Sequence, residues 1–403
     1  MISVNQAETI ILDLIQPVTD TETVDLHNAV TRILATAIKS DLDFPYWDNS
    51  AMDGYAVRYE DVTNPPLNLT IVAEIPAGKV PQKTISQGEA ARIYTGGMLP
   101  PGADTIIMQE YTQRQGDRLV ILKAPKAPQA FVRKKGEYYQ PGNPLLKEGI
   151  TLSAAEIAVL ATIQVIDIPV KRRPKVAILS TGDELVNPSQ PLQPGKIIDS
   201  NQYALYAFVL SQGAIPIPLG IVPDNPEELR DKISQAIEVA DIVLSTGGVS
   251  VGSYDYVEQI LKELGAKIAI SSVAVKPGKP LTVAKFPQGC VYFGIPGNPV
   301  SALVSCWRFV QPAIAKLSGK QQPWIPQWLA AENLQTLKST SDRETYVWGR
   351  LNIHQGVYQF KLASGSQNSG NLINLAQTNA IAVIPRGNNT IVEGDKIMTL
   401  ITK

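Results

Sequence analysis

Two lysines in a rigid loop are the clearest sign of an anion site in this sequence. Lys276 and Lys279 lie three residues apart in Lys-Pro-Gly-Lys-Pro, where two prolines restrict the backbone. Lysine ammonium groups suit oxyanions such as phosphate or molybdate, although a solvated basic turn has the same composition. The Pro-Gly-Asn-Pro of residues 296–299 is similarly rigid, and Ser301 follows it. Backbone N–H groups and a hydroxyl there could complete an anion pocket.

Three glycine-containing loops follow apolar, strand-like runs and predict a second part of the same site. They span residues 180–184, 245–252 and 294–299. In an open parallel α/β sheet, ligands bind beyond the carboxyl ends of the strands. Gly247 and Gly248 would let backbone N–H groups approach a phosphate closely. The alternative is that these glycines only make tight strand-to-helix turns.

Two carboxylates accompany these loops. Glu184 closes the first loop and Asp255 follows the second. Carboxylates at the ends of neighbouring strands could hold Mg²⁺ against phosphate oxygens. Each one alone could equally be a helix N-cap or a solvated surface acid.

The loops need a sheet to position them, and the sequence between residues 174 and 318 predicts one. Short apolar runs alternate there with helical patterns, which predicts a parallel sheet covered on both faces. The expected strands are 175–180, 215–221, 241–245, 268–275 and 291–295, and the expected helices are 201–211, 226–239, 256–264 and 300–317.

The flanking segments have different patterns. Residues 3–16 have the apolar spacing of a helix, and a second short helix is expected over 24–37. Residues 70–122 and 329–403 show short β-branched runs between turns, which predicts two small β domains, the second a barrel or sandwich. The predicted domains are 1–44 with 136–173, 45–135, 174–322 and 323–403.

The composition of the 403 residues excludes several classes of protein. With 44% hydrophobic residues, 18% charged residues and a net charge of −1, it gives no global reason to expect binding to nucleic acid or an anionic membrane. Two cysteines and two histidines provide neither a disulfide framework nor a Cys-rich zinc site. The sequence lacks a signal-peptide pattern and any run of about 20 apolar residues, so we expect a cytoplasmic protein.

Six separated motifs resemble the molybdopterin molybdenumtransferase family, called MoeA in bacteria and related to the E domain of gephyrin. Their order agrees with that family from end to end. The motifs are NSAMDGYAV at 49–57, IYTGG at 93–97, STGDEL at 180–185, STGGVSVGSYDY at 245–256, KPGKP at 276–280 and GIPGNPVSAL at 294–303.

The resemblance implies a multidomain α/β and β protein. Its parts would be an elongated linker domain with an inserted β domain, a MogA-like doubly wound α/β domain that binds molybdopterin, and a C-terminal β-barrel. It also implies a homodimer whose active sites each use both chains. The implied reaction inserts molybdate into adenylylated molybdopterin and releases AMP with the help of Mg²⁺, and a MogA-type adenylyltransferase is an implied partner.

The resemblance also assigns roles to individual residues. The implied catalytic and metal-handling residues are Asp53, Thr95, Glu184 and Asp255, with Asp53, Glu184 and Asp255 as the metal ligands. The implied substrate-binding residues are Gly247, Gly248, Ser250, Asp224, Lys276, Lys279, Ser301, Arg343 and Ser369.

Three other functions remain open from the sequence. A molybdopterin adenylyltransferase of the MogA type resembles residues 174–318 only, so the additional domains favour metal insertion. A non-catalytic scaffold that binds a partner peptide, as the gephyrin E domain does, would need no intact metal and oxyanion set. A nucleotide or pyrophosphate hydrolase is the third alternative, because CinA-like domains share the α/β part.

One position departs from the family pattern and generates a prediction. The family commonly has Gly-Glu-Asp where this chain has Gly136-Glu137-Tyr138. Because a carboxylate at this position would add to metal handling, we expect Tyr138→Asp to raise turnover. The measurement is the rate of AMP release from adenylylated molybdopterin. An unchanged or lower rate would contradict a role for that carboxylate.

Overall fold

The computed structural model describes residues 1–247, 254–388 and 390–402, with only the backbone of 254 and 255. These residues form two compact units. The larger unit comprises Met1–Thr36, Gly149–Ala158 and Ile166–Lys403, and the smaller unit comprises Ala37–Glu148 and Val159–Val165. None of the helices in the described ranges is long and apolar enough to cross a membrane.

A six-stranded sheet forms the centre of the larger unit. Its order is β14 (Ile215–Val222), β11 (Lys175–Thr181), β15 (Ile242–Thr246), β19 (Val291–Ile295), β18 (Pro280–Lys285) and β16 (Lys267–Ser272). The first four strands are parallel, whereas β18 runs antiparallel to both of its neighbours, so β16 has the same direction as the first four strands. A wholly parallel sheet was therefore the wrong expectation. The connections on either side of β18 are too short for the crossover that parallel strands require.

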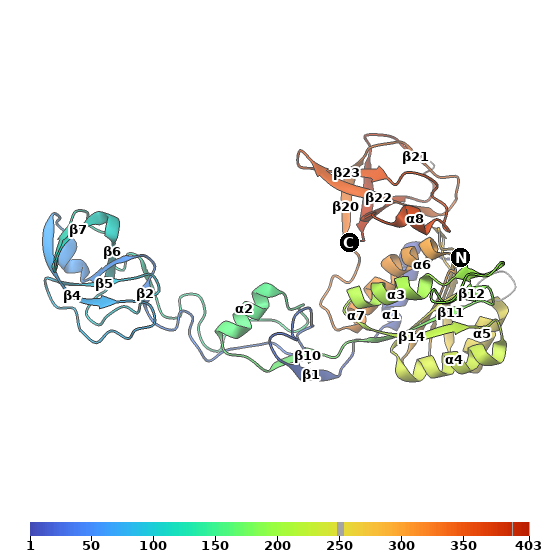
Figure 1. Cartoon of the computed structure of the whole chain (residues 1–403), viewed down its shortest axis with the longest axis horizontal. Coiled ribbons are helices and arrows are strands. Elements are labelled where there is room, and N and C mark those ends of the chain that lie inside the picture. Colours follow the sequence, from blue (N-terminus) through green and yellow to red (C-terminus); the bar gives the residue numbers. More distant parts are fainter. Residues whose placement is uncertain (248–253, 389, 403) are drawn as a thin grey trace. The chain divides into compact units, whose positions relative to one another are not determined.

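Helices cover both faces of this sheet (Figure 1). On one face lie α1 (Val4–Leu14), α3 (Asn201–Ser211), α6 (Pro299–Ser305), the π-helical turn η3 (Cys306–Val310) and α7 (Gln311–Leu317). On the other lie α4 (Pro226–Val239) and α5 (Tyr254–Glu263). Side chains alternate along β11, so Val176 and Ile178 contact the first layer while Ala177 and Leu179 contact the second.

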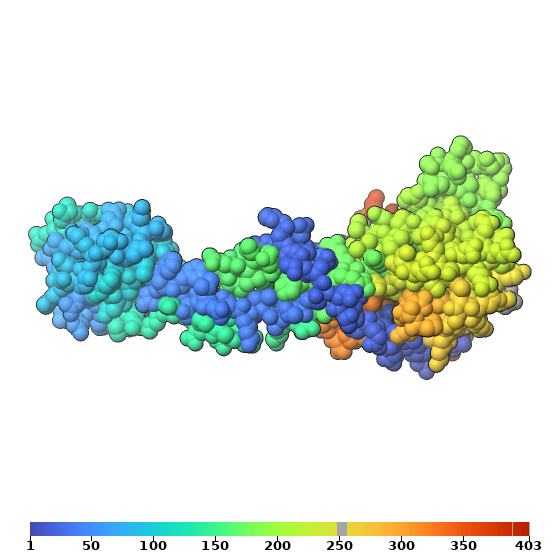
Figure 2. Space-filling model, turned by 90° about the horizontal axis from the view of Figure 1, so that it is seen from below, coloured from blue at the N-terminus to red at the C-terminus, as the bar shows by residue number. Residues whose placement is uncertain are grey.

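The N-terminal helix α1 packs against elements that lie about 300 residues later in the sequence, such as η3 and α7. Figure 2 shows the first residues, in dark blue, against the orange residues of the α/β part. Lys316 Nζ of α7 donates to the Leu12 carbonyl oxygen at 2.8 Å. Ser3 caps α1 in a reciprocal arrangement with Gln6, which confirms the helix expected over 3–16.

A closed five-stranded barrel ends the larger unit. Its strands are β22 (Glu344–His354), β23 (Val357–Leu362), β20 (Trp328–Asn333), β26 (Lys396–Ile401) and β24 (Ala380–Ile384), and β24 pairs again with β22. The short strand β17 (Val275–Lys276) joins β22 in parallel. The minor elements here and in the α/β part are β12 (Leu185–Val186), β13 (Ile197–Ile198), β21 (Leu337–Lys338), α8 (Leu372–Leu375) and β25 (Thr390–Ile391).

Residues 24–37 do not form the expected helix. Instead β1 (Thr21–Val24) pairs antiparallel with β10 (Ile168–Lys171), and the chain then turns. Leu34 N–H donates to the Ile150 carbonyl at 3.0 Å, and Ala35 N–H donates to the Pro169 carbonyl at 2.9 Å. These partners lie over 100 residues away, so long-range backbone pairing outweighs the local apolar spacing.

The smaller unit confirms the first of the two predicted β domains. Its sheet has the order β6 (Thr105–Met108), β3 (Gly54–Val57), β5 (Glu89–Ile93), β4 (Leu67–Ile75), β8 (Arg118–Ile121) and β7 (Thr112–Gln115). The remaining elements are β2 (Asn49–Ser50), η1 (Tyr59–Val62), η2 (Gln109–Tyr111) and β9 (Val132–Arg133). Helix α2 (Ala154–Thr162) contributes residues to both units.

An ion pair in the larger unit predicts a loss of stability in acid. Arg172 donates to both carboxylate oxygens of Asp241 at 2.7 and 2.8 Å, and the Lys175 amide donates to Asp241 at 2.8 Å. Burial raises the pKa of the Asp241 carboxyl, but the hydrogen bonds from Arg172 and Lys175 outweigh burial and hold this pKa below its usual value.

A depressed carboxyl pKa stabilises the folded state above the unfolded-state value of about 3.9, and this contribution disappears as the pH falls through the folded-state pKa. We expect Asp241→Asn to lower the free energy of unfolding by about 2 kcal/mol at pH 7. Urea titrations should show this difference beginning to shrink below about pH 4 and disappearing as the pH falls through the folded-state pKa of Asp241. A difference that persists unchanged in acid would contradict the assignment.

Candidate functional site

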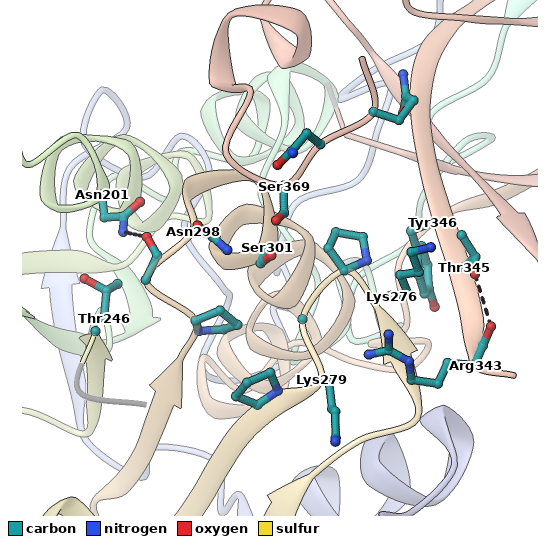
Figure 3. A pocket seen from close by; sticks show the side chains of 18 of the residues that line it. Asn201, Thr246, Lys276, Lys279, Asn298, Ser301, Arg343, Thr345, Tyr346 and Ser369 are labelled. Atoms are coloured by element: carbon teal, nitrogen blue, oxygen red, sulfur yellow. Dashed lines mark hydrogen bonds between the residues drawn. The ribbon is translucent and has the colours of Figure 1, made fainter. Parts of the chain in front are cut away.

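A cavity of about 830 Å³ lies at the carboxyl ends of β11, β15 and β19 and reaches the C-terminal barrel. Figure 3 shows side chains from both parts of the larger unit turned toward it. Seven of the residues predicted for the site line this cavity. They are Glu184, Gly247, Lys276, Lys279, Ser301, Arg343 and Ser369.

Four cationic side chains line the cavity; Lys338 of β21 was not predicted, and the other three define what is called the cationic end below. Lys276 and Lys279 come from the loop between β16 and β18, and Arg343 precedes β22 of the barrel. Neither lysine ammonium group has a hydrogen bond or ion pair with a residue in the described part of the chain. Arg343 donates from Nη1 to the Val275 carbonyl oxygen and from Nε to Ser341 Oγ, each at 3.2 Å. This end therefore presents positive charge that no described carboxylate neutralises.

The lysine loop is held by contacts that tolerate little change. Gly278 has φ +107°, a conformation that favours glycine, and a Cβ there would crowd Ser305 Oγ at 3.1 Å. The Val273 N–H donates to the Lys279 carbonyl at 3.0 Å and closes the loop. Across the cavity, the Val300 N–H donates to the Ser369 carbonyl at 3.1 Å and ties a barrel loop to α6.

A buried polar network supports the barrel strand that borders the cavity. Arg308, which is 5% exposed, forms an ion pair with Glu8 of α1. Its Nε also donates to the hydroxyl oxygen of Tyr346 at 3.1 Å, and that hydroxyl donates to Glu344 at 2.5 Å. Burial raises the pKa of Tyr346 well above its usual value, so the phenol keeps its proton. The network therefore fixes β22 against α1 and η3.

The other end of the cavity, called the strand end below, carries the Glu184 carboxylate and otherwise neutral groups. Thr181, Thr246 and Gly247 line it at the ends of β11 and β15. Gly247 has φ +85°, and a Cβ there would lie 2.1 Å from the Thr181 carbonyl oxygen. Close packing of two strand ends is thus sufficient to require this glycine. Asn201 also lines this end, and its Nδ2 donates to the Gly297 carbonyl at 2.7 Å (Figure 3).

Two of the predicted acidic residues, Glu184 and Asp224, lie at the described edge of the sheet. Glu184 lines the cavity, and its carboxylate lies over Gly182. Asp224 follows β14, is exposed, and donates its N–H to Asp183 at 3.1 Å. In the part of the chain that the structure describes, no three His, Cys, Asp or Glu side chains form a group that could hold a metal. Gly248, Ser250 and the side chain of Asp255 lie outside the described residues.

Asp53 and Thr95 lie together in the smaller unit, although 42 residues separate them. Asp53 Oδ1 accepts hydrogen bonds from Thr95 N at 2.8 Å and from Thr95 Oγ1 at 2.7 Å. First the Thr95 amide, then its hydroxyl and the charge of Arg92, hold the pKa of Asp53 below its usual value. Arg92 lies 5.1 and 4.9 Å from the ring centroids of Tyr55 and Tyr94. The predicted pair is thus an ionised carboxylate in a hydrogen-bonded turn.

Several lining residues were not predicted from the sequence. Asn201 follows Asp199-Ser200 at a helix start, a pattern typical of an ordinary cap. Thr345 and Tyr346 lie in a strand of a different domain from the lysines, and Gln367 and Asn368 lie in a loop. Nothing in the local sequence distinguishes these positions.

Comparisons with known proteins agree with this architecture. Models of three protein families match the chain. They are the MoeA N-terminal region (domain I and II) over residues 2–163, a probable molybdopterin binding domain over 177–316 and the MoeA C-terminal region (domain IV) over 330–401. The matched regions and the barrel confirm the expected multidomain fold with a MogA-like α/β domain.

Individual relatives match over nearly the whole chain. A molybdopterin molybdenumtransferase of a Nostoc species is 55% identical over 99% of this chain and 94% of its own length. The enzyme of the same name from Haemophilus influenzae is 36% identical over 89% and 86%. A crystal structure of a molybdopterin biosynthesis MoeA protein from Pyrococcus horikoshii has a TM-score of 0.85 and 29% identity over the full length of both chains. The chain belongs to the molybdopterin molybdenumtransferase family, the MoeA proteins.

The Asp53 turn generates a prediction. Thr95→Val removes the hydroxyl donor but keeps the amide donor and the branched side chain. We therefore expect the pKa of Asp53 to rise toward its usual value without reaching it. Carboxyl ¹³C NMR titration measures this change. Thr70→Val, the same substitution at an exposed position of β4, is the control, and an Asp53 pKa equal in wild type and Thr95→Val would contradict the assignment.

Proposed function

We propose that this protein inserts molybdate into adenylylated molybdopterin and releases AMP. The proposal rests mainly on one observation: the side chains of Lys276, Lys279 and Arg343 line the same cavity. The relatives that match nearly the whole chain bear the name of this enzyme. That name favours metal insertion over adenylyl transfer, a scaffold role and nucleotide hydrolysis.

The chemistry needs cations that gather two kinds of anion. Molybdate carries two negative charges, and the substrate has a phosphoanhydride whose P–O bond breaks as a water or molybdate oxygen bonds to phosphorus and AMP leaves. Fixed positive groups stabilise the charge that develops on the departing phosphate oxygen. Lys276, Lys279 and Ser301 would hold molybdate, while Arg343 and Ser369 would contact oxyanion from the barrel side. Gly247, with Gly248 and Ser250, would contact pterin and phosphate.

The described donors fit a magnesium ion held mainly by the substrate. Mg²⁺ usually binds through one or two carboxylates together with phosphate oxygens rather than in an all-protein cage. Glu184, the cavity's carboxylate in the described part, suits that mode, with Asp53 and Asp255 as further ligands. When bound, the ion would polarise the phosphoanhydride. Asp224, beside Asp183, would add to the negative field at this edge.

We further propose a cytoplasmic homodimer in which Asp53 and Thr95 of one protomer complete the cavity of its partner. Asp53 and Thr95 belong to the smaller unit, whereas the cavity lies wholly within the larger unit. The larger unit also exposes apolar side chains on α3 and β14. Tyr203, Tyr206, Leu210 and Ile215 are each more than 40% exposed. Such a patch is typical of an interface. A MogA-type adenylyltransferase would supply the substrate.

The decisive experiment measures AMP release from adenylylated molybdopterin with and without molybdate. We expect molybdate-dependent release, with metal transferred to the pterin. Lys279→Ala removes a cation from the cavity and should lower the rate by at least about tenfold, because one charged hydrogen bond contributes about 1.5–3 kcal/mol. Lys361→Ala, on the exposed face of the barrel, is the matched control. Molybdate-independent release, or none, would contradict the proposal.

A further inference from the structure

One polar atom at the strand end of the cavity lacks a partner. The Asn201 Oδ1 atom is buried and has no hydrogen-bond partner, although Asn201 lines the cavity. A buried amide oxygen without a donor destabilises a folded protein, so such atoms need an explanation. Figure 3 shows the Asn201 side chain beside the Gly297 loop, with Oδ1 turned away from that contact.

The surroundings fix which amide atom is left over. Nδ2 donates to the Gly297 carbonyl oxygen at 2.7 Å. Rotating the amide by 180° would place Oδ1 against that carbonyl, and two acceptors would then face each other. The unused group of Asn201 is therefore an acceptor, set by the backbone of the neighbouring loop.

The neighbouring hydroxyls do not supply the missing donor. Thr181 Oγ1 donates to the Thr246 carbonyl oxygen at 3.3 Å, and Thr246 Oγ1 donates to Ser180 Oγ at 3.2 Å. Both threonine hydroxyls are thus directed into the protein, and within the described ranges no donor reaches Asn201 Oδ1. A ligand that satisfies Asn201 must bring its own N–H or O–H group.

This requirement differs from that of the cationic end. Lys276, Lys279 and Arg343 carry only donors, so they select oxyanions, which have acceptor atoms. The cavity of about 830 Å³ is large enough for an organic ligand together with an oxyanion. One ligand can therefore place an anionic group at the cationic end and an N–H-bearing ring at the strand end.

We propose that Asn201 Oδ1 accepts a hydrogen bond from an N–H group of a fused nitrogen heterocycle of the substrate. This inference rests on the proposed function, because adenylylated molybdopterin contains two such rings, the pterin and the adenine. Asn201 is then a specificity-determining residue for the heterocycle and makes no contact with molybdate.

Binding measurements on the full-length protein test this role. AMP and 6-hydroxymethylpterin are the probes for the two rings, and equilibrium dialysis follows molybdate. We expect Asn201→Ala to weaken binding of one ring probe about tenfold, the effect of one well-made hydrogen bond. The weakened probe identifies the ring. In Asn201→Ala, molybdate binding and the unfolding midpoint should equal those of wild type. Asn352→Ala, on the exposed face of β22, is the control and should leave all of these quantities unchanged.

Asn201→Asp separates recognition from a structural role. The aspartate loses the donor to Gly297 but keeps an acceptor oxygen, so it should retain more ring affinity than alanine. Equal losses in both variants would assign the effect to the Gly297 contact and overturn the proposal. Wild-type affinity for both rings in Asn201→Ala would overturn it too. These binding measurements do not require turnover. Failure of the proposed function would instead be seen as absent AMP release, so the two failures can be distinguished.

Discussion

The cavity depends on the pairing of two residues with a distant strand. Val275 and Lys276 of β17 pair in parallel with Glu344 and Thr345 of β22. Through this pairing, the lysine loop of the α/β part and Arg343 of the barrel share one space. The hydrogen bond from Arg343 to the Val275 carbonyl adds a side-chain contact to the two-residue ladder. Without the pairing of β17 with β22, Arg343 would lie on a different surface from Lys276 and Lys279.

A two-residue strand pairing is weak by itself, and the buried polar network stabilises the strand β22 that takes part in it. Glu8, Arg308, Tyr346 and Glu344 join α1, η3 and β22 in one chain of hydrogen bonds. A buried ion pair contributes little net stability compared with apolar packing, yet removal of one member is strongly destabilising. Such a network therefore favours one arrangement over its competitors. Here it keeps the barrel strand in the register that presents Arg343 to the lysines.

The sequence predicts the parts of the site that local pattern determines. The apolar runs that end in glycine loops place Glu184 and Gly247 at one sheet edge, because carboxyl ends of parallel strands coincide. The proline-stiffened loop predicts Lys276 and Lys279 as an anion site. Residues 24–37 fail as a helix because their backbone partners lie near residues 150 and 170. Tyr346 owes its role to a hydrogen bond from Arg308, 38 residues earlier. The orientation of Asn201 is set by Gly297, 96 residues later. No local sequence pattern encodes either contact.

The position of α1 affects how this chain is made. Its buried face, with Ala7 and Ile11, packs on a layer that includes η3, and Glu8 pairs with Arg308, a residue 300 positions later. At a synthesis rate of about 5–20 residues per second, α1 leaves the ribosome roughly 15–60 s before that partner exists. During this interval its apolar stripe has no native surface to cover it. Completion of the larger unit is therefore a late event in translation, and until then the nascent chain exposes the apolar residues of its N-terminal segment.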